Sequence, residues 1–166
     1  MNPKNMRRLI TETLEKIDHY YTITKTDINL IEMTFLMESD MNNLFSEGHI
    51  DKRGMFMVSN AMLEDIILNV IKPSKKAKEN ILKVSLVDID ADSQEDLFDS
   101  AAYNIAFQIS VLFYFYFTKL NDMPMDISQC ADAYYTHWKR HDLISGTQRN
   151  AAIKAFIEYD KEAKRS

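Results

Sequence analysis

The sequence predicts an all-α fold, a single-domain bundle of about five to seven helices that occupies residues 1–166. Glycine and proline are scarce, with three of each in the chain, whereas an average chain of this length holds roughly twenty of the two together. Sheet folds need these residues for their frequent turns, so the scarcity favours long helices. Apolar residues also recur at spacings of three and four, the period of one helix face.

Composition limits the class of protein. Apolar residues make up 46% of the chain and charged residues 27%, as in a globular protein. The lone cysteine, Cys130, excludes an intramolecular disulfide and a multi-cysteine metal site. Arg7 and Arg8 precede a charged, periodic stretch and not an apolar signal-peptide core. Because the net charge is −5, neither nucleic acid nor an anionic membrane is favoured as a general partner, and we expect a cytoplasmic protein.

Turn signals divide the chain into candidate helices at about 4–20, 27–45, 55–72, 74–86, 94–120, 126–141 and 147–164. In the first, Met6, Ile10 and Leu14 belong to one apolar stripe. Thr24-x-x-Asp27 resembles a capping box at the start of the second, with Asp in the place usually taken by Glu. The second helix is apolar on more than one side, which indicates extensive burial.

The polar loop 46–54 separates the second and third helices, and Pro73 ends the third because it cannot donate a backbone hydrogen bond. Ser74 caps the fourth helix. A strand is an alternative across 82–90, where Leu82 and Leu86 alternate with polar residues. We favour the helix because a single strand would leave its backbone groups without hydrogen-bond partners.

The fifth segment, about 94–120, predicts a central apolar helix that begins after Ser93. Residues 100–118 include no charged side chain and approach the length of a membrane span. Asn104 and Gln108 argue against such a span, so we expect no membrane association. The helix is either the hub of the bundle or also buries surface against a second molecule, which leaves a homo-oligomer open.

The last two predicted helices flank Gly146, and the first of them, at about 126–141, contains the candidate metal ligands. His137 and His141 lie four residues apart and so project from one helical face, a spacing suited to two metal ligands. A metal-dependent helical enzyme is therefore one hypothesis. Trp138 stands where a zincin has its catalytic Glu, and histidines near a helix C-terminus are commonly solvated or interact with the helix dipole.

A nucleic-acid-associated regulator is the second alternative. Its candidate contacts are the basic segments 72–78 and 161–165, since Lys and Arg neutralise phosphates. Acidic Glu158, Asp160 and Glu162 interrupt the second of these surfaces, and nucleic acid is therefore the less favoured partner.

The leading hypothesis is a non-enzymatic protein-interaction protein, such as an inhibitor, an immunity or antitoxin-type binder, an adaptor or a chaperone. No phosphate-binding loop, dinucleotide fingerprint or nucleophile elbow is present, so we expect no cofactor. Ten Met, eight Tyr and nine Phe suit either a core or an adaptable contact surface. The candidate partner-binding residues are neighbouring aromatics that cannot all point into one core stripe: Tyr20, Tyr21, Tyr134, Tyr135 and Trp138.

Overall fold

The computed structural model describes residues 2–17, 22–39 and 52–165. It confirms the all-α prediction, since the structure is 73% helical. The described part contains a two-stranded hairpin, β1 (Lys52–Arg53) and β2 (Val58–Ser59), and two π-helical turns, η1 (Ile67–Ile71) and η2 (Tyr134–Trp138). Its α-helices are α1 (Pro3–Lys16), α2 (Lys25–Ser39), α3 (Asn60–Ile66), α4 (Lys75–Ser85), α5 (Gln94–Tyr103), α6 (Ile105–Lys119), α7 (Ile127–Ala133) and α8 (Gly146–Lys164).

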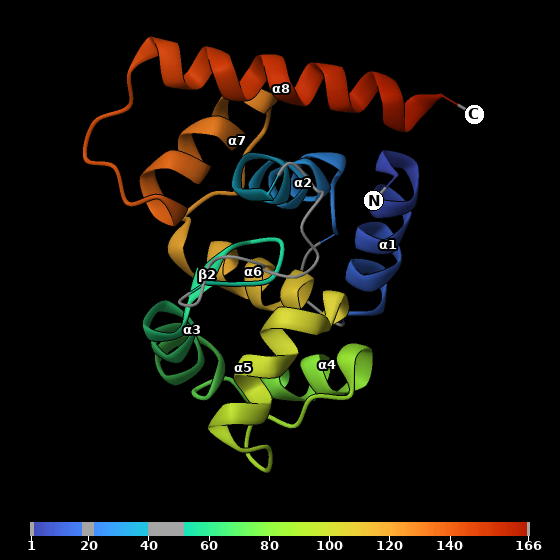
Figure 1. Cartoon of the computed structure of the whole chain (residues 1–166), viewed down its shortest axis with the longest axis vertical. Coiled ribbons are helices and arrows are strands. Elements are labelled where there is room, and N and C mark those ends of the chain that lie inside the picture. The colour runs from blue at the N-terminus through green and yellow to red at the C-terminus, as the bar shows by residue number, and fades with distance from the viewer. Residues whose placement is uncertain (1, 18–21, 40–51, 166) are drawn as a thin grey trace.

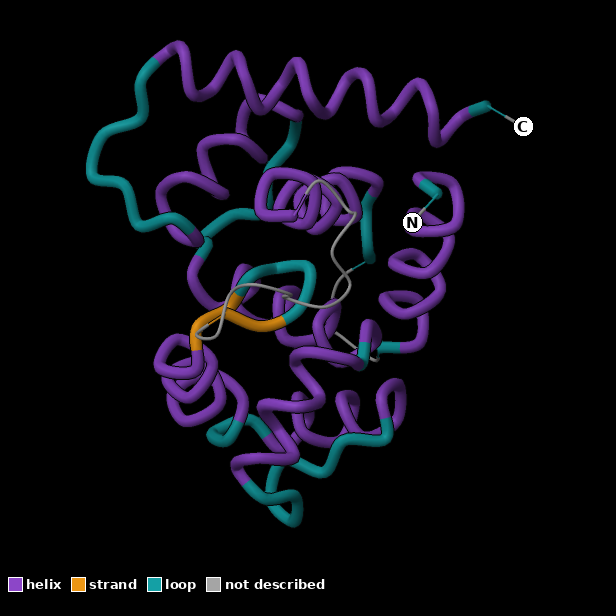
Figure 2. The backbone as a smooth tube through the Cα atoms, in the orientation of Figure 1, coloured by secondary structure: helices purple, strands orange, loops and turns teal. Residues whose placement is uncertain are grey.

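Helix α6 is the centre of the bundle and contacts α1, α2, α4, α5 and η1. Every residue from Phe107 to Tyr116 is buried, so this helix is apolar on all sides, as a hub helix must be. Helix α8 runs across one end of the molecule, and α4 and α5 lie toward the other end (Figure 1). The tube in Figure 2 shows the hairpin between these two ends.

The predicted central helix is two helices, and the prediction of one helix across 94–120 was wrong. Asn104 ends α5 with φ −104° and ψ 100° and then caps α6. Its side-chain oxygen accepts the Phe107 N–H at 3.0 Å, and its amide nitrogen donates to the Ser85 carbonyl at 2.8 Å. The second bond comes from a distant part of the chain and therefore leaves no local trace in the sequence.

Apolar residues three and four apart on α6 form a core stripe. Ile109, Leu112 and Tyr116 are fully buried, while Ile105 is only partly buried and packs against the core. The Tyr116 hydroxyl hydrogen-bonds with the Thr34 hydroxyl at 2.8 Å, joining α6 to α2. A buried hydroxyl with a partner avoids the cost of desolvation without a hydrogen bond.

Three other predicted helices have different bounds. The first, expected over 4–20, ends at Lys16, because Ile17 is extended. The helix expected from residue 55 begins at Asn60, because the hairpin occupies the preceding residues and Ser59 supplies the N-cap. The helix expected to reach residue 141 ends at Trp138 as the π-helical turn η2. The helical reading of 74–86 is confirmed as far as Ser85, after which Leu86 takes the left-handed conformation with φ 62°. The predicted cap at the start of α2 is confirmed by reciprocal hydrogen bonds between Thr24 and Asp27.

The hairpin packs closely on the central helices. Gly54 begins its turn with φ +68°, a left-handed conformation that favours glycine. The next backbone N–H, of Met55, donates to the buried Gln108 side-chain oxygen at 2.8 Å. This bond satisfies a polar side chain within the apolar helix α6 and fixes the hairpin against it.

None of the described helices is long and apolar enough to cross a bilayer. Helix α6, the most apolar of them, has 15 residues, and a span requires about 20.

Candidate functional site

Three of the predicted partner-binding aromatics lie inside the fold. Tyr134 is 1%, Tyr135 7% and Trp138 5% exposed. The expectation that these rings are exposed was wrong, because η2 packs its inward face against α2 and the hairpin. Tyr20 and Tyr21 lie outside the described residues.

Each of these aromatic rings has a structural partner. The Trp138 ring stacks on Phe56 and meets Phe115 edge-on, with centroids 5.7 and 5.1 Å away. The Tyr134 hydroxyl donates to Glu38 at 2.8 Å, and Lys139 approaches the same carboxylate oxygen at 3.2 Å. Burial and the neighbouring Glu38 charge raise the pKa of Tyr134. These contacts stabilise the fold and leave no exposed aromatic surface on η2.

The two candidate metal ligands line different hollows. His137 borders a pocket of about 200 Å³ between α7 and the α6–α7 connection. Partial burial and then the charge of Lys119 lower its pKa. His141 borders a pocket of about 260 Å³ beside Glu38 and Lys139. Its ring lies 3.2 Å from the Gln148 amide and stacks on Tyr135. No group of three His, Cys, Asp or Glu side chains suited to a metal occurs in the described ranges.

The basic segments lie at opposite ends of the molecule. Segment 72–78 leads into α4, and segment 161–165 closes α8 (Figure 1). Lys78 is paired with Asp90 at 2.7 Å, and Lys161 with Glu158 at 3.0 Å. A phosphate-binding surface requires several cations that face the same ligand. The two basic segments are far apart and partly paired with carboxylates, so they do not form one continuous basic surface.

An apolar hollow of about 570 Å³ opens between the start of α2 and the α6–α7 connection. We call it the Met125 groove, and it is lined by Thr24, Thr26, Asp27, Phe117, Asn121, Asp122, Met123, Pro124 and Met125. Met125 is 83% and Phe117 42% exposed. The Phe117 ring stacks on Phe113 with centroids 5.8 Å apart, which holds one wall of the groove to the core.

The sequence reading missed this groove. Helical spacing places Phe117 in the predicted central helix and leaves residues 121–125 between two predicted helices. The available signal was a pair of methionines, Met123 and Met125, in a short connection beside Pro124, where large apolar residues have no helical stripe to join. Their proximity to Thr24 is a long-range contact and could not be read from spacing.

Fold and surface together define an all-helical bundle with a hub helix, two π-helical turns and an open apolar groove. No protein-family model matches the chain, and neither the characterised proteins nor the solved structures include a significant match.

Proposed function

We propose that this protein works by binding another protein, without catalysis, and that the Met125 groove is the contact surface. The observation that carries the proposal is the exposure of Phe117 and Met125 around a hollow of about 570 Å³. Large apolar side chains around a concave surface are typical of sites that accept an anchor residue from a partner.

The groove chemistry selects the kind of partner. Met is flexible and polarizable, so Met123 and Met125 suit an apolar side chain of variable shape. The charged groups that line the groove are the carboxylates of Asp27 and Asp122. An acidic anchor would be repelled, whereas a basic neighbour of the anchor would be attracted. The expected partner therefore presents a Leu, Met or aromatic side chain next to Lys or Arg.

The nucleic-acid alternative has weaker support than the Met125 groove. Its cations are divided between α4 and α8, and several of them already face carboxylates. The metal alternative is weaker again, because His137 and His141 border separate pockets.

The test compares two variants of exposed apolar residues. Met125→Asp places a charge in the groove, and Leu143→Asp makes the same kind of change at a residue that is 88% exposed in the α7–α8 connection. Both variants should have the melting temperature of the wild type, because both side chains are exposed. We expect affinity capture from native-host extract to recover a partner with the wild type and Leu143→Asp, and to lose it with Met125→Asp.

The captured partner is then purified and titrated at two salt concentrations. An apolar contact with one basic neighbour predicts an affinity that weakens only modestly with salt, while weakening as steep as that of a phosphate-binding surface would contradict the proposal. Retention of the partner by Met125→Asp would exclude the groove as the contact surface. If sedimentation shows that the wild type dimerises and Met125→Asp does not, the occupant is a second copy and not a different protein.

A further inference from the structure

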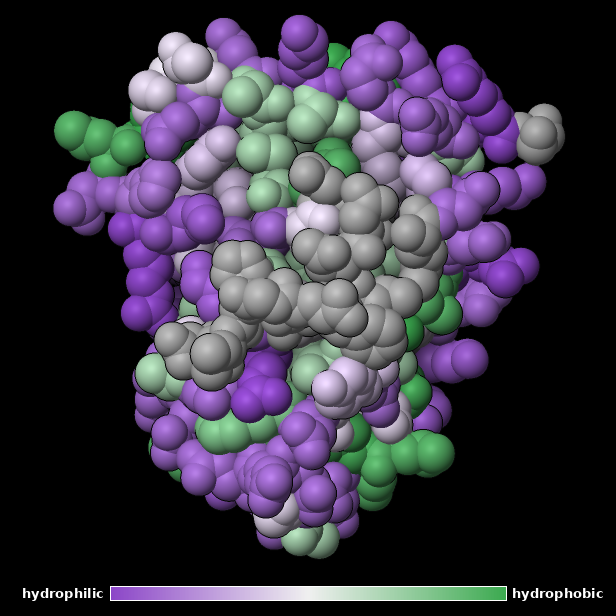
Figure 3. All heavy atoms as spheres, in the orientation of Figure 1, coloured by the Kyte–Doolittle hydropathy of each residue, from purple (hydrophilic) through white to green (hydrophobic). Residues whose placement is uncertain are grey.

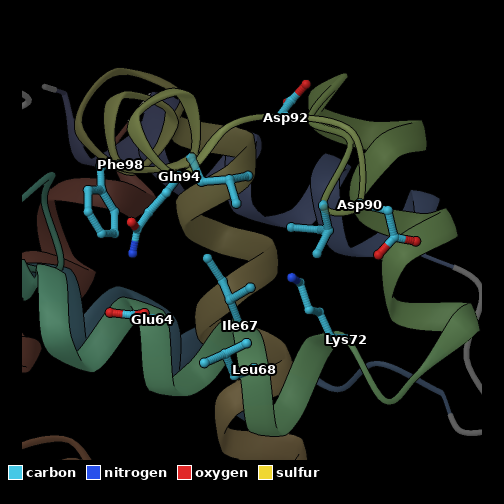
Figure 4. A pocket seen from close by; sticks show the side chains of 10 residues that line it. Glu64, Ile67, Leu68, Lys72, Asp90, Asp92, Gln94 and Phe98 are labelled. Carbon is cyan, nitrogen blue, oxygen red and sulfur yellow. The ribbon is translucent and has the colours of Figure 1, made fainter.

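A second pocket, distant in sequence from the groove, lies between η1 and the start of α5 (Figure 4). We call it the Lys72 pocket, and its volume is about 280 Å³. Apolar side chains that line it are Ile67, Leu68, Ile89, Leu97 and Phe98. Ile67, Ile89 and Leu97 are at most 6% exposed, so this lining is continuous with the core.

The π-helical turn brings the apolar and cationic parts of this pocket together. In η1 the Lys72 N–H donates to the Ile67 carbonyl at 2.8 Å, a hydrogen bond over five residues. Residues five apart in an α-helix point about 140° away from each other, because each residue turns by about 100°. The wider π turn places Ile67 and Lys72 on the same side. Such turns are rare and frequently occur at functional sites.

Polar groups lie at both ends of the pocket. Figure 4 shows the Lys72 amine directed into it at one end, with Ile67 between it and the Glu64 carboxylate and Gln94 amide. Within the described ranges, no hydrogen bond or ion pair engages the side chain of Lys72, Glu64 or Gln94. Of the two acids near Lys72, Asp90 pairs with Lys78 at 2.7 Å, and one carboxylate oxygen of Asp92 accepts the Asp88 N–H at 3.1 Å.

We propose that the Lys72 pocket binds a small linear zwitterion, with a carboxylate at one end, an ammonium group at the other and a short hydrocarbon between them. The carboxylate pairs with the Lys72 ammonium group, and the ligand ammonium group donates to Glu64 and Gln94. The hydrocarbon covers Ile67 and Leu97. This site is independent of the Met125 groove and does not depend on the protein-binding proposal.

The spacing sets the length of the ligand. Glu64 and Lys72 are eight residues apart, which would be about 12 Å along an α-helix axis and is shorter here because η1 is a wider turn with a smaller rise per residue. Both Cα–Cβ bonds lean toward the helix N-terminus, but the Lys72 side chain is longer than that of Glu64, so its reach shortens the gap that the ligand must bridge. An extended ω-amino acid with a chain of about six carbons has a comparable separation of charges, whereas the two charges of an α-amino acid are adjacent. The volume of the pocket is near the lower end for small-molecule sites.

The probe for the test is 6-aminohexanoate, titrated into the full-length protein and followed by NMR at the methyl groups of Ile67, Ile89 and Leu97. Hexanoate lacks the ammonium group, hexylamine lacks the carboxylate, and glycine is too short to reach both ends. We expect saturable binding of 6-aminohexanoate and weaker binding of all three analogues.

Matched variants separate this site from a general surface effect. Lys72→Gln should weaken 6-aminohexanoate binding about tenfold or more, because a charge-assisted hydrogen bond is lost. Lys83→Gln removes a similarly exposed lysine from α4 and should have no effect. Glu64→Gln should weaken 6-aminohexanoate but leave hexanoate unchanged or tighter. The proposal is overturned if the wild type shows no saturable shifts, or if Lys72→Gln and Lys83→Gln bind equally well.

Discussion

The indole N–H of Trp138 donates to the carbonyl oxygen of Phe56 across 3.2 Å. This bond joins η2 to the turn of the hairpin, two parts of the chain that are 82 residues apart. The two rings also stack, so the contact combines a satisfied polar group with apolar burial. Trp138 is therefore part of the core that fixes the hairpin, and changes at this residue should be read as changes in stability.

Replacement of Trp138 should separate packing from hydrogen bonding. We expect Trp138→Ala to lower the free energy of unfolding by about 3–5 kcal/mol, as for other buried aromatic truncations. Trp138→Phe keeps much of the packing but leaves the Phe56 carbonyl without its donor, a loss of about 1–3 kcal/mol. Urea titrations followed by circular dichroism measure both. An unchanged midpoint for Trp138→Ala would contradict burial of the indole.

Leu86 offers a test of backbone strain. It is 85% exposed and has φ 62°, so the side chain contributes little packing while the backbone adopts a conformation that costs a non-glycine residue about 1–2 kcal/mol. Leu86→Gly should raise the free energy of unfolding by up to about 1 kcal/mol. The matched change Leu82→Gly, inside α4, should lower it by a similar amount because glycine is a poor helix former. Destabilisation by both variants would show that Leu86 makes contacts worth more than the strain.

The parts of the fold that the sequence predicted well depend on local chemistry. The Thr24–Asp27 cap and the Ser74 and Ser93 caps each join residues three apart. The period of apolar residues likewise identifies the helices from neighbouring positions. These features are visible in a short window because their hydrogen bonds close within it.

The features that were predicted wrongly depend on contacts between segments that are distant in the sequence. The break at Asn104 depends on Ser85, and the hairpin at 52–59 is anchored by Gln108. Burial of Trp138 requires both the π turn and Phe56. The candidate groove could not be predicted either, since the exposure of Phe117 and Met125 is set by how α2 and the α6–α7 connection pack. The spacing of apolar residues does not reveal where a tertiary contact ends a helix.

Two glycines make a matched pair for the hairpin. A Cβ at Gly54 would clash with the Ala101 carbonyl and lie 2.6 Å from the Gln108 side chain, at a positive φ. A Cβ at Gly146, the first residue of α8, would meet nothing within 4 Å. Gly54→Ala should therefore destabilise by more than about 1 kcal/mol, and Gly146→Ala should stabilise by up to about 1 kcal/mol. Thermal unfolding measures the difference in melting temperature between the two variants. Equal melting temperatures would show that the hairpin can shift to accept the added Cβ without loss of stability.

The Cys130 thiol should be unreactive toward alkylating reagents in the folded protein. It is fully buried, and burial followed by the charges of Asp126 and Asp27 raises the pKa of its thiol to about 12. Because the thiolate is the reactive form, alkylation at pH 8 should be slow in buffer and rapid in denaturant. Mass spectrometry with iodoacetamide measures the two rates. Rapid labelling of the native protein would mean that α7 opens readily from α2.

A buried ion pair with its hydrogen-bond partners attaches α8 to the first two helices. Arg7 from α1 makes two hydrogen bonds to the carboxylate of Glu32 in α2, at 2.7 and 3.0 Å. Tyr159 from α8 donates to the same carboxylate at 2.9 Å, and Asp160 meets Arg7 at 2.9 Å. Glu32 is fully buried, so the cluster has its carboxylate in the interior and its cation nearer the surface.

A double-mutant cycle should show that Arg7 and Glu32 act together. Glu32→Gln alone leaves Arg7 without its buried counter-charge, and we expect a loss of about 3 kcal/mol, the lower end for such pairs because Arg7 is 21% exposed. Arg7→Met alone leaves a buried carboxylate without its cation and should cost at least as much.

When both are replaced, neither charge of the pair remains in the interior, so the double variant should lose at least about 1 kcal/mol less than the sum of the two single losses. Urea unfolding of the four proteins measures the difference. The control is Tyr159→Phe, which removes no charge but removes the hydroxyl's hydrogen bonds to Glu32 at 2.9 Å and to the Pro3 carbonyl at 3.3 Å, with an expected loss of about 1–2 kcal/mol. Strictly additive losses would mean that Arg7 and Glu32 stabilise the fold independently, with Arg7 satisfied by Asp160 and solvent.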